Sequence, residues 1–165
     1  MKKEMLTKAA YLTQLTKRVQ WQNAELNYEL KRPVSAAGKN VWIEERGKNI
    51  KATMENLAKE YGLIFFFSSN CPYCHRYAPI IKSLGNSYGL KILGISLDGK
   101  CLTEFLDCRM NRGESEVMGV TAVPTTLLFN KSSGRTEIIG TGILSITQLE
   151  ERIYKILKIE VGDDY

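Results

Sequence analysis

Cys71 and Cys74, separated by Pro72 and Tyr73, follow closely after an apolar run, Leu63–Phe67. The run is short and does not alternate with polar residues, which is typical of a strand buried on both faces of a sheet. Pro72 favours the first turn of a helix, because the N–H that it lacks would have no intrahelical partner there. The sequence therefore predicts a buried strand, a short loop and a helix from about Pro72 to Leu84 that opens with the cysteine pair.

Cysteines at positions i and i+3 of a first helical turn lie within disulfide range, about 5–6 Å between Cα atoms. The free backbone N–H groups and the positive end of the helix dipole favour the thiolate of Cys71. We therefore expect Cys71 to be a catalytic nucleophile and Cys74 to be the resolving thiol. The single histidine, His75, either tunes the thiol or lies unused on the helix surface.

Other chemistries use the same residue types. The stretch Cys71–His75 also fits c-type haem attachment, with Met110 or Met118 as a second axial ligand, but haem attachment gives no reason for the buried strand before it. A zinc site would add Cys101 and Cys108, whose six intervening residues exceed the usual two to four. A static disulfide is the third alternative. We expect disulfide exchange, with no metal and no cofactor.

The rest of the chain predicts the elements of an α/β domain with an N-terminal helical arm. A helix is expected over residues 3–20, irregular chain over 21–38, and a further helix that ends near Gly62. Ser145 and Gln148 form a capping box that opens a last helix. The strands and loops expected after the cysteine motif are a strand at Leu90–Ser96, a loop-rich region at 97–119, a strand at Thr125–Phe129, a turn at 131–134 and its hairpin partner at Arg135–Ile139.

The charge is concentrated at the N-terminus. Residues 1–40 carry eight Lys and Arg against three Glu, a net of +5 that equals the net charge of the whole chain. We divide the chain into an arm, 1–46, and a domain, 47–165. The arm lacks a dense basic cluster, so we expect a solvated surface and no nucleic-acid partner.

Membrane insertion is not expected either. The longest apolar run has five residues, whereas a spanning helix needs about 20. Glu4, Thr7 and Lys8 interrupt the apolar core that a secretory signal peptide would need.

Several of these features together resemble the thioredoxin fold. They are the cysteine motif at a helix start, Pro79 five residues after Cys74, and Val123-Pro124 before a hairpin. The resemblance implies that Pro124 is a cis-proline facing the cysteines and that Pro72, Tyr73, Val123 and Pro124 line a substrate groove. A cis X–Pro bond is a deliberate feature of such a site. One position departs from the pattern, because Phe65 stands where many relatives bury an acid that takes the proton of the resolving thiol.

Beyond the cysteine motif the chain resembles the TraF family of conjugative-transfer proteins. The segments that carry this likeness are 21–28, 31–34, 61–67, 96–99 and 142–145. The related TrbB-like disulfide isomerases share the cysteine motif and segment 96–99, but not segment 21–28. The chain begins partway into the family's N-terminal helical region, so we expect it to be truncated or processed.

The resemblance implies a periplasmic protein that serves assembly of a conjugative pilus and type IV secretion apparatus. Its expected partners are cysteine-containing proteins of that apparatus, and its own redox partner is unknown. Some family members lack the cysteine pair, so the expected oxidase or isomerase activity rests on Cys71 and Cys74 themselves. The alternative is a non-catalytic scaffold or chaperone-like subunit of the same apparatus.

Cys101 and Cys108 allow two mutually exclusive structures. Leu102, Phe105 and Leu106 fit one face of a helix, but seven helical residues rise about 10.5 Å, beyond the roughly 7 Å Cα limit for a disulfide. An oxidising compartment favours joined cysteines. We therefore predict a structural disulfide and a segment that folds back on itself.

Overall fold

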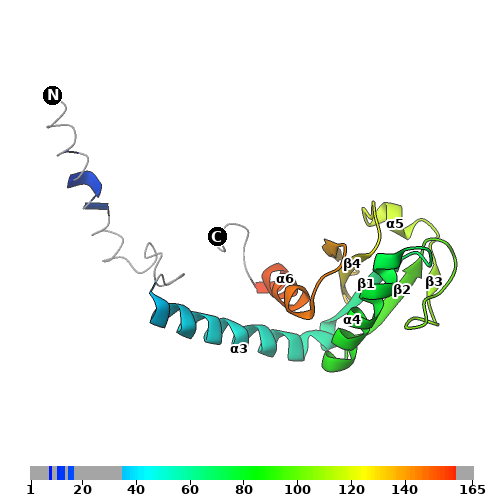
Figure 1. Ribbon diagram of the computed structural model, residues 1–165, viewed down its shortest axis with the longest axis horizontal. Helices are drawn as coiled ribbons and strands as arrows, with labels where there is room; N and C mark the ends of the chain where they lie inside the picture. The colour runs from blue at the N-terminus through cyan, green and yellow to red at the C-terminus, as the bar shows by residue number, and fades with distance from the viewer. Residues whose placement is uncertain (1–7, 9–10, 14, 17–34, 159–165) are drawn as a thin grey trace. The chain divides into compact units, whose positions relative to one another are not determined.

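The computed structural model describes residues 8, 11–13, 15–16 and 35–158 (Figure 1). It divides into two compact units, Met1–Lys48 and Asn49–Tyr165, and the division falls inside helix α3, Ala36–Glu60. The expected boundary after residue 46 falls in the same helix and stays a prediction. None of the helices within the described residues is both long and apolar enough to span a membrane.

Most of the predicted N-terminal helix, 3–20, lies outside the described residues, and those that are described there are helical. The prediction of irregular chain over 21–38 is wrong at its C-terminal end, because α3 already begins at Ala36. The hydroxyl of Ser35 accepts the N–H of Gly38 at 3.2 Å, which caps the helix start. Residues 21–34 lie outside the described part of the chain.

The end of α3 also differs from the prediction. The helix ends at Glu60, and Gly62 lies inside the first strand rather than acting as a stop. Met54 and Leu57 are the buried residues of its last turns, in agreement with their helical spacing. A Cβ at Gly62 would lie 3.2 Å from the carbonyl oxygen of Lys91, so this glycine serves close strand approach.

A five-stranded sheet forms the centre of the second unit, with strand order β3-β2-β1-β4-β5. The central strand β1 runs parallel to β2 and antiparallel to β4, and β5 pairs antiparallel with β4. The expected strands are confirmed, but the loop-rich region also holds a two-residue strand, β3, and a one-turn helix, α5. The bounds are β1 Tyr61–Phe67, β2 Ile92–Ser96, β3 Arg109–Met110, α5 Glu114–Val117, β4 Thr125–Asn130 and β5 Thr136–Thr141.

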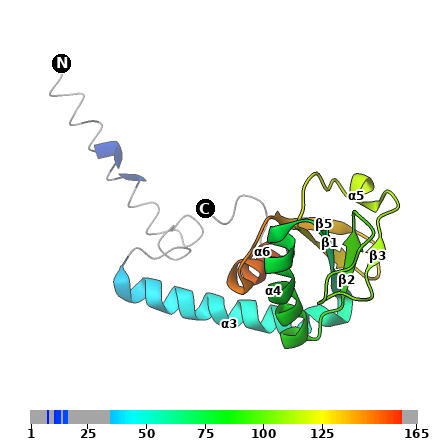
Figure 2. The ribbon, with the colours of Figure 1, turned by 45° about the vertical axis from the view of Figure 1, so that its right-hand side comes forward.

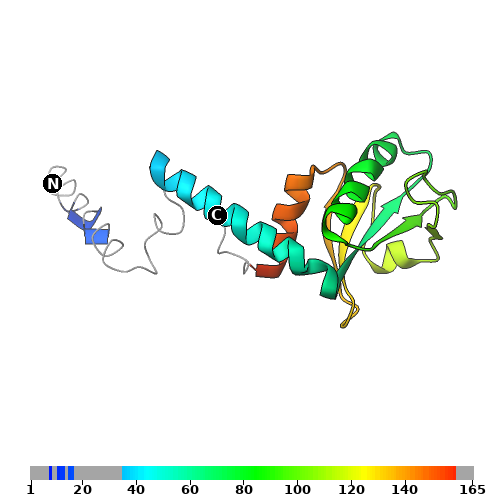
Figure 3. The same cartoon turned by 90° about the horizontal axis from the view of Figure 1, so that it is seen from below.

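The two faces of the sheet are covered unequally. Helices α4, Pro72–Tyr88, and α6, Ile146–Lys158, lie on one face, and α5 lies on the other (Figures 2 and 3). Alternate residues of β1 serve the two faces: Phe65 and Phe67 join the core under α4 and α6, whereas Phe66 joins the smaller cluster. This parallel β1–α4–β2 unit followed by an antiparallel hairpin and a closing helix is the predicted thioredoxin-like fold.

Local signals set the ends of the two covering helices. Ser145 and Gln148 form the predicted capping box: the N–H of Gln148 donates to the Ser145 hydroxyl at 3.2 Å, and the N–H of Ser145 donates to the Gln148 side chain at 2.9 Å. Helix α4 runs past the expected end at Leu84 to Tyr88, because the first left-handed residue is Gly89, with φ of 65°.

The hairpin of β4 and β5 contains a bulge. Thr126 pairs with Gly140 and Leu127 with Ile138, so Ile139 has no partner in β4. The guanidinium of Arg152 donates to the carbonyl oxygen of Ile139 at 3.0 Å. A side chain at Gly140 would collide with this guanidinium, so the glycine makes room for the bond between α6 and the bulge.

Candidate active site

The cysteine motif lies at the C-terminal end of β1, where a short loop turns into α4. Cys71 is the N-cap of α4 and has an extended backbone, with φ of −94° and ψ of 110°. Its sulfur accepts the backbone N–H of Cys74 at 3.2 Å. The Cys71 sulfur therefore takes the place that a serine or aspartate oxygen usually has at a helix start, where negative charge is stabilised.

The two sulfurs of this motif have different surroundings. Both cysteines are free; Cys71 is half-buried and Cys74 is fully buried. Burial, together with the hydrogen bond to Cys71, raises the pKa of the Cys74 thiol to about 12. Cys74 is therefore protonated at neutral pH, and Cys71 is the sulfur that a partner can reach.

A turn from a later part of the chain lies beside Cys71. The Val123–Pro124 peptide bond is cis, and the thiol of Cys71 lies 3.9 Å from the carbonyl oxygen of Val123. The N–H of Gly142 donates to the carbonyl oxygen of Pro124 at 2.7 Å, which ties this turn to the end of β5. The fold thus brings Cys71 and Val123 together across 52 positions of sequence.

The other two predicted groove residues lie on the surface of the first helical turn. Pro72 is exposed, and 62% of Tyr73 is accessible to solvent. Among the predicted groove residues, Val123 approaches a cysteine sulfur through its carbonyl oxygen, at 3.9 Å from the Cys71 thiol.

Phe65 fills the position at which the resemblance leads one to expect an acid. Its ring packs edge-on against Tyr77, with 5.6 Å between ring centroids. The Tyr77 hydroxyl and the Thr126 hydroxyl form a buried hydrogen bond of 2.8 Å. Burial raises the pKa of Tyr77 to about 12 despite that bond, so this pair is uncharged at neutral pH. Phe65 itself offers no group that could take the proton of Cys74.

Asp98 is a site residue that the sequence analysis did not single out. It stands two residues after the end of β2, and its carboxylate accepts the N–H of Ser69 at 3.0 Å and the Ser69 hydroxyl. The carbonyl oxygen of Ser69 lies 2.7 Å from Nε2 of His75. The signal was an acid at the end of a strand parallel to β1, because the carboxyl ends of parallel strands share one edge.

The second cysteine pair is joined by a disulfide. The Cα atoms of Cys101 and Cys108 are 5.6 Å apart, and the segment between them forms turns rather than a helix. Leu102 and Phe105 are buried beneath it. Because both sulfurs are bonded, they do not complete a zinc site with the first pair, and the described residues hold no group of three or more metal-ligating side chains.

The two methionines considered as haem ligands lie in unlike places. Met110 is exposed in β3. Met118 packs against the cluster on the face of the sheet opposite to Cys74. Met118 is therefore separated from the cysteine motif by the sheet.

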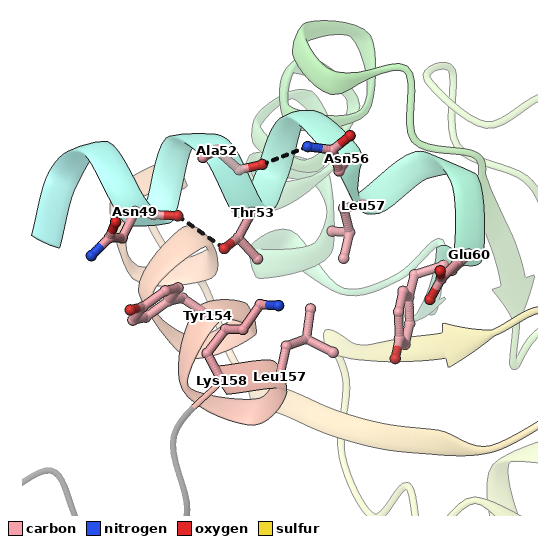
Figure 4. Close-up of a pocket in the computed structure, with 10 residues that line it drawn as sticks. Asn49, Ala52, Thr53, Asn56, Leu57, Glu60, Tyr154, Leu157 and Lys158 are labelled. Atoms are coloured by element: carbon pink, nitrogen blue, oxygen red, sulfur yellow. Dashed lines mark hydrogen bonds between the residues drawn. The ribbon is translucent and has the colours of Figure 1, made fainter.

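A cavity of about 690 Å³ lies between the last turns of α3 and helix α6 (Figure 4). Polar side chains such as Asn56 and Lys158 line it, with the ring of Tyr154 at one end. None of its lining residues belongs to the cysteine motif or to the turn at Pro124. The Cys71 sulfur therefore lies outside this cavity.

Three known proteins are similar in sequence to this chain. Protein TraF of Escherichia coli (strain K12) is 24% identical over 106 residues, which is 64% of this chain and 43% of that protein. Protein TrbB of the same strain is 38% identical over 50 residues, 30% of this chain and 27% of TrbB. Thioredoxin of Buchnera aphidicola is 28% identical over 111 residues, 67% of this chain and 90% of that protein.

Among solved structures, the chain is similar to a putative thiol:disulfide interchange protein DsbE from Chlorobium tepidum. The identity is 17%, the TM-score is 0.48, and the match covers 61% of this chain and 82% of the other.

The chain spans less than half the length of the TraF and TrbB relatives that it matches. The model of the family described as "TraF: F plasmid transfer operon protein" matches residues 1–154, nearly the whole chain. That match agrees with the thioredoxin-like fold and the cysteine motif, and the chain belongs to the TraF family.

Proposed function

We propose that this chain is a periplasmic thiol–disulfide oxidoreductase that acts on cysteines of proteins in a conjugative pilus and type IV secretion apparatus. The observation that carries the proposal is the unequal cysteine pair at the start of α4. Cys71 caps the helix and is partly accessible, whereas Cys74 is buried one turn further on. This arrangement suits one sulfur that exchanges with a partner and a second that resolves the product.

In the oxidising direction the cycle starts from a Cys71–Cys74 disulfide. A substrate thiolate attacks Cys71, the bond between the two cysteines breaks, and Cys74 leaves as a thiolate that takes up a proton. A second substrate thiolate then attacks the substrate sulfur of the mixed disulfide and releases the Cys71 thiolate. The substrate gains a disulfide and loses two electrons, and the protein is left as the dithiol.

In isomerisation the reduced protein acts first. The Cys71 thiolate attacks a wrong substrate disulfide, forms a mixed disulfide and releases one substrate sulfur as a thiolate. Either a different substrate thiol then attacks the bound substrate sulfur and releases Cys71, or Cys74 attacks Cys71, which releases the substrate in its reduced form and leaves the Cys71–Cys74 disulfide. When Cys74 resolves the mixed disulfide, its thiol must first lose a proton. Since Phe65 replaces the usual acid, we assign that proton to water, His75 or the substrate.

Substrate recognition would use the turn at Val123. An extended substrate segment lying beside Pro124 would pair with the backbone of Val123, as an added strand. The carbonyl oxygen of Val123 lies 3.9 Å from the Cys71 sulfur, so such a segment would bring its own cysteine to Cys71. Tyr73, exposed on the first turn of α4, would pack against the same segment.

A glutathione redox titration of Cys71 and Cys74 tests the proposed reaction. A reduction potential of about −120 mV would favour an oxidase, a potential of about −180 mV an isomerase, and a potential of about −270 mV a reductase. The substrate class is tested by Cys74→Ser in cells that carry the conjugation system. We expect this variant to retain substrates on Cys71, to be identified by mass spectrometry.

The matched control is the double variant Cys71→Ser/Cys74→Ser. If conjugation and the oxidation state of the apparatus are normal in cells with the double variant, the exchange function is wrong and the chain acts as a scaffold. Misoxidised apparatus proteins in the same cells would support exchange.

A further inference from the structure

The Asp98 carboxylate joins two segments, the stretch 96–100 and the loop that leads to Cys71. One oxygen accepts the N–H of Ser69 at 3.0 Å and the Ser69 hydroxyl. The other accepts the Ser96 hydroxyl at 2.9 Å and the N–H of Lys100 at 3.3 Å. The single hydrogen of the Ser96 hydroxyl is shared between this oxygen and the carbonyl oxygen of Lys100, at 2.8 Å. Each carboxylate oxygen nevertheless faces a backbone N–H, of Ser69 or of Lys100, which can only donate, so an amide N–H has no place at either oxygen. These bonds, led by the Ser69 hydroxyl, hold the pKa of Asp98 well below its usual range.

Ser69 links the Asp98 carboxylate to the first turn of α4. Its carbonyl oxygen lies 2.7 Å from Nε2 of His75, and a carbonyl can only accept, so Nε2 of the imidazole bears the hydrogen. The N–H of Cys71 donates to Ser68 at 3.2 Å, and the N–H of His75 donates to the Cys71 carbonyl at 3.3 Å. The loop 68–71 and the first turn of α4 thus form one bonded unit whose outer end is fixed by Asp98.

We propose that Asp98 is a positioning residue for Cys71: through Ser69 it fixes the loop that makes the Cys71 sulfur the cap of α4, and it sets the tautomer of His75. The proposal rests on the proposed exchange function, for which Cys71 must react as a thiolate. The Asp98 carboxylate does not touch the sulfur, and its effect reaches Cys71 through the backbone of residues 69–71.

Charge and geometry predict different effects for the variant Asp98→Asn. The loss of a negative charge does not by itself make a nearby thiolate less reactive, because like charges disfavour each other. The loss of the anchor instead lets the loop relax and weakens the 3.2 Å bond from the Cys74 N–H to the sulfur. If Asp98 acts by position, the variant reacts more slowly, which the change in charge does not account for.

The test is the rate at which iodoacetamide alkylates Cys71 in the reduced protein, measured by peptide mass spectrometry over pH 5–10. We expect Asp98→Asn to slow the reaction about tenfold at pH 7, the size of one lost hydrogen bond to a charged group, and to move the midpoint of the pH profile upward. Ser69→Ala removes only the hydroxyl and should slow the reaction about threefold. Asp107→Asn, which neutralises an exposed acid in the 101–108 loop, is the matched control and should leave the rate unchanged.

A second readout distinguishes positioning from general loosening of the fold. His75 is the single histidine of the chain, so its ring nitrogens give unobscured NMR signals. In the wild type we expect the neutral ring with hydrogen on Nε2, and in Asp98→Asn a mixture of the two tautomers. If Asp98→Asn does not fold, as judged by its thermal melt, Ser69→Ala decides the question by the same two measurements.

An alkylation rate equal to or above that of the wild type in folded Asp98→Asn would overturn the proposal, as would an unchanged rate in Ser69→Ala if only that variant folds. The assay needs no protein substrate. A wild type that fails to exchange disulfides would therefore refute the proposed function, while the role of Asp98 at Cys71 would still be measured.

Discussion

The two cysteine pairs of this chain differ in bonding state and in local structure. Cys71 and Cys74 are free thiols at the start of a 17-residue helix, one half-buried and the other fully buried. Cys101 and Cys108 are joined, and they lie in a loop of turns where neither begins a helix. A backbone N–H donates to the sulfur of Cys71, whereas the second pair serves to close a ring of eight residues.

The surroundings of the sulfurs suit the first pair to disulfide exchange and the second to a structural bond. The helix start supplies a donor and a positive potential to Cys71. The loop 101–108 instead supplies apolar anchors, because Leu102 and Phe105 are buried beside the disulfide. The variants below test this division of roles, beginning with the largest expected effect.

Replacing Cys71 by serine should reduce disulfide exchange to the background rate, because a serine hydroxyl does not ionise at neutral pH and forms no mixed disulfide. The measurement is reduction or refolding of a disulfide-containing substrate such as insulin. The double variant Cys101→Ser/Cys108→Ser is the control and should keep its exchange activity. If that control loses activity while Cys71→Ser keeps it, the two pairs have been assigned the wrong roles.

Phe105→Ala should lower the free energy of unfolding by about 3–5 kcal/mol, the usual cost of removing a buried phenylalanine ring. Phe105 is 1% exposed, and its ring centroid lies 5.3 Å from the ring centroid of Phe65. Leu106→Ala is the neighbouring control: Leu106 is 80% exposed, so its loss should change stability by less than about 0.5 kcal/mol. Urea denaturation measures both, and equal effects would show that the loop is not anchored by burial.

Removing the second disulfide should have a smaller effect. The double variant Cys101→Ser/Cys108→Ser should lose roughly 2.5 kcal/mol, as the chain-entropy model gives for a ring of eight residues. The same urea experiment on wild type with and without reductant provides the comparison. A loss larger than that of Phe105→Ala would mean that the covalent bond, rather than the buried ring, holds the loop in place.

The last prediction concerns the buried thiol and is confined to alkaline pH. Burial raises the pKa of Cys74 to about 12, so above pH 9 the native state holds a proton that the unfolded state loses. Stability of the reduced protein should therefore fall as pH rises from 9 toward 12. Tyr77 titrates in the same range and is present in every variant, so the difference from Cys74→Ala isolates the thiol. Parallel stability–pH curves for these two proteins would contradict the prediction.

Local patterns accounted for much of the fold. The apolar run of β1, the proline at the start of α4 and the Ser145–Gln148 capping box each act within a few residues, and each was predicted. Strand β3 could not be, because Arg109 and Met110 become a strand only by alignment with Ile95 and Ser96 of β2. A two-residue strand leaves no periodic pattern in the sequence.

The site also combines a local pattern with contacts between residues that are distant in sequence. The spacing of Cys71 and Cys74 identified the pair directly, whereas the approach of Val123 to Cys71 was expected only from a family resemblance. The bond between Asp98 and Ser69 joins residues 29 positions apart. Such contacts depend on how β1 and β2 align, so a side chain's chemistry alone does not reveal its partner.

The bulge in β5 has a consequence for self-association. The sheet ends at β3, which has two residues, and at β5, which has six and so offers the longer edge to a second copy of the chain. An edge strand of this length can recruit a further strand and start aggregation. In β5 the regular row is broken at Ile139, whose carbonyl oxygen is already occupied by Arg152. Because the bulge interrupts the regular row of backbone groups on β5, we expect it to hinder the addition of a strand from another chain along this edge.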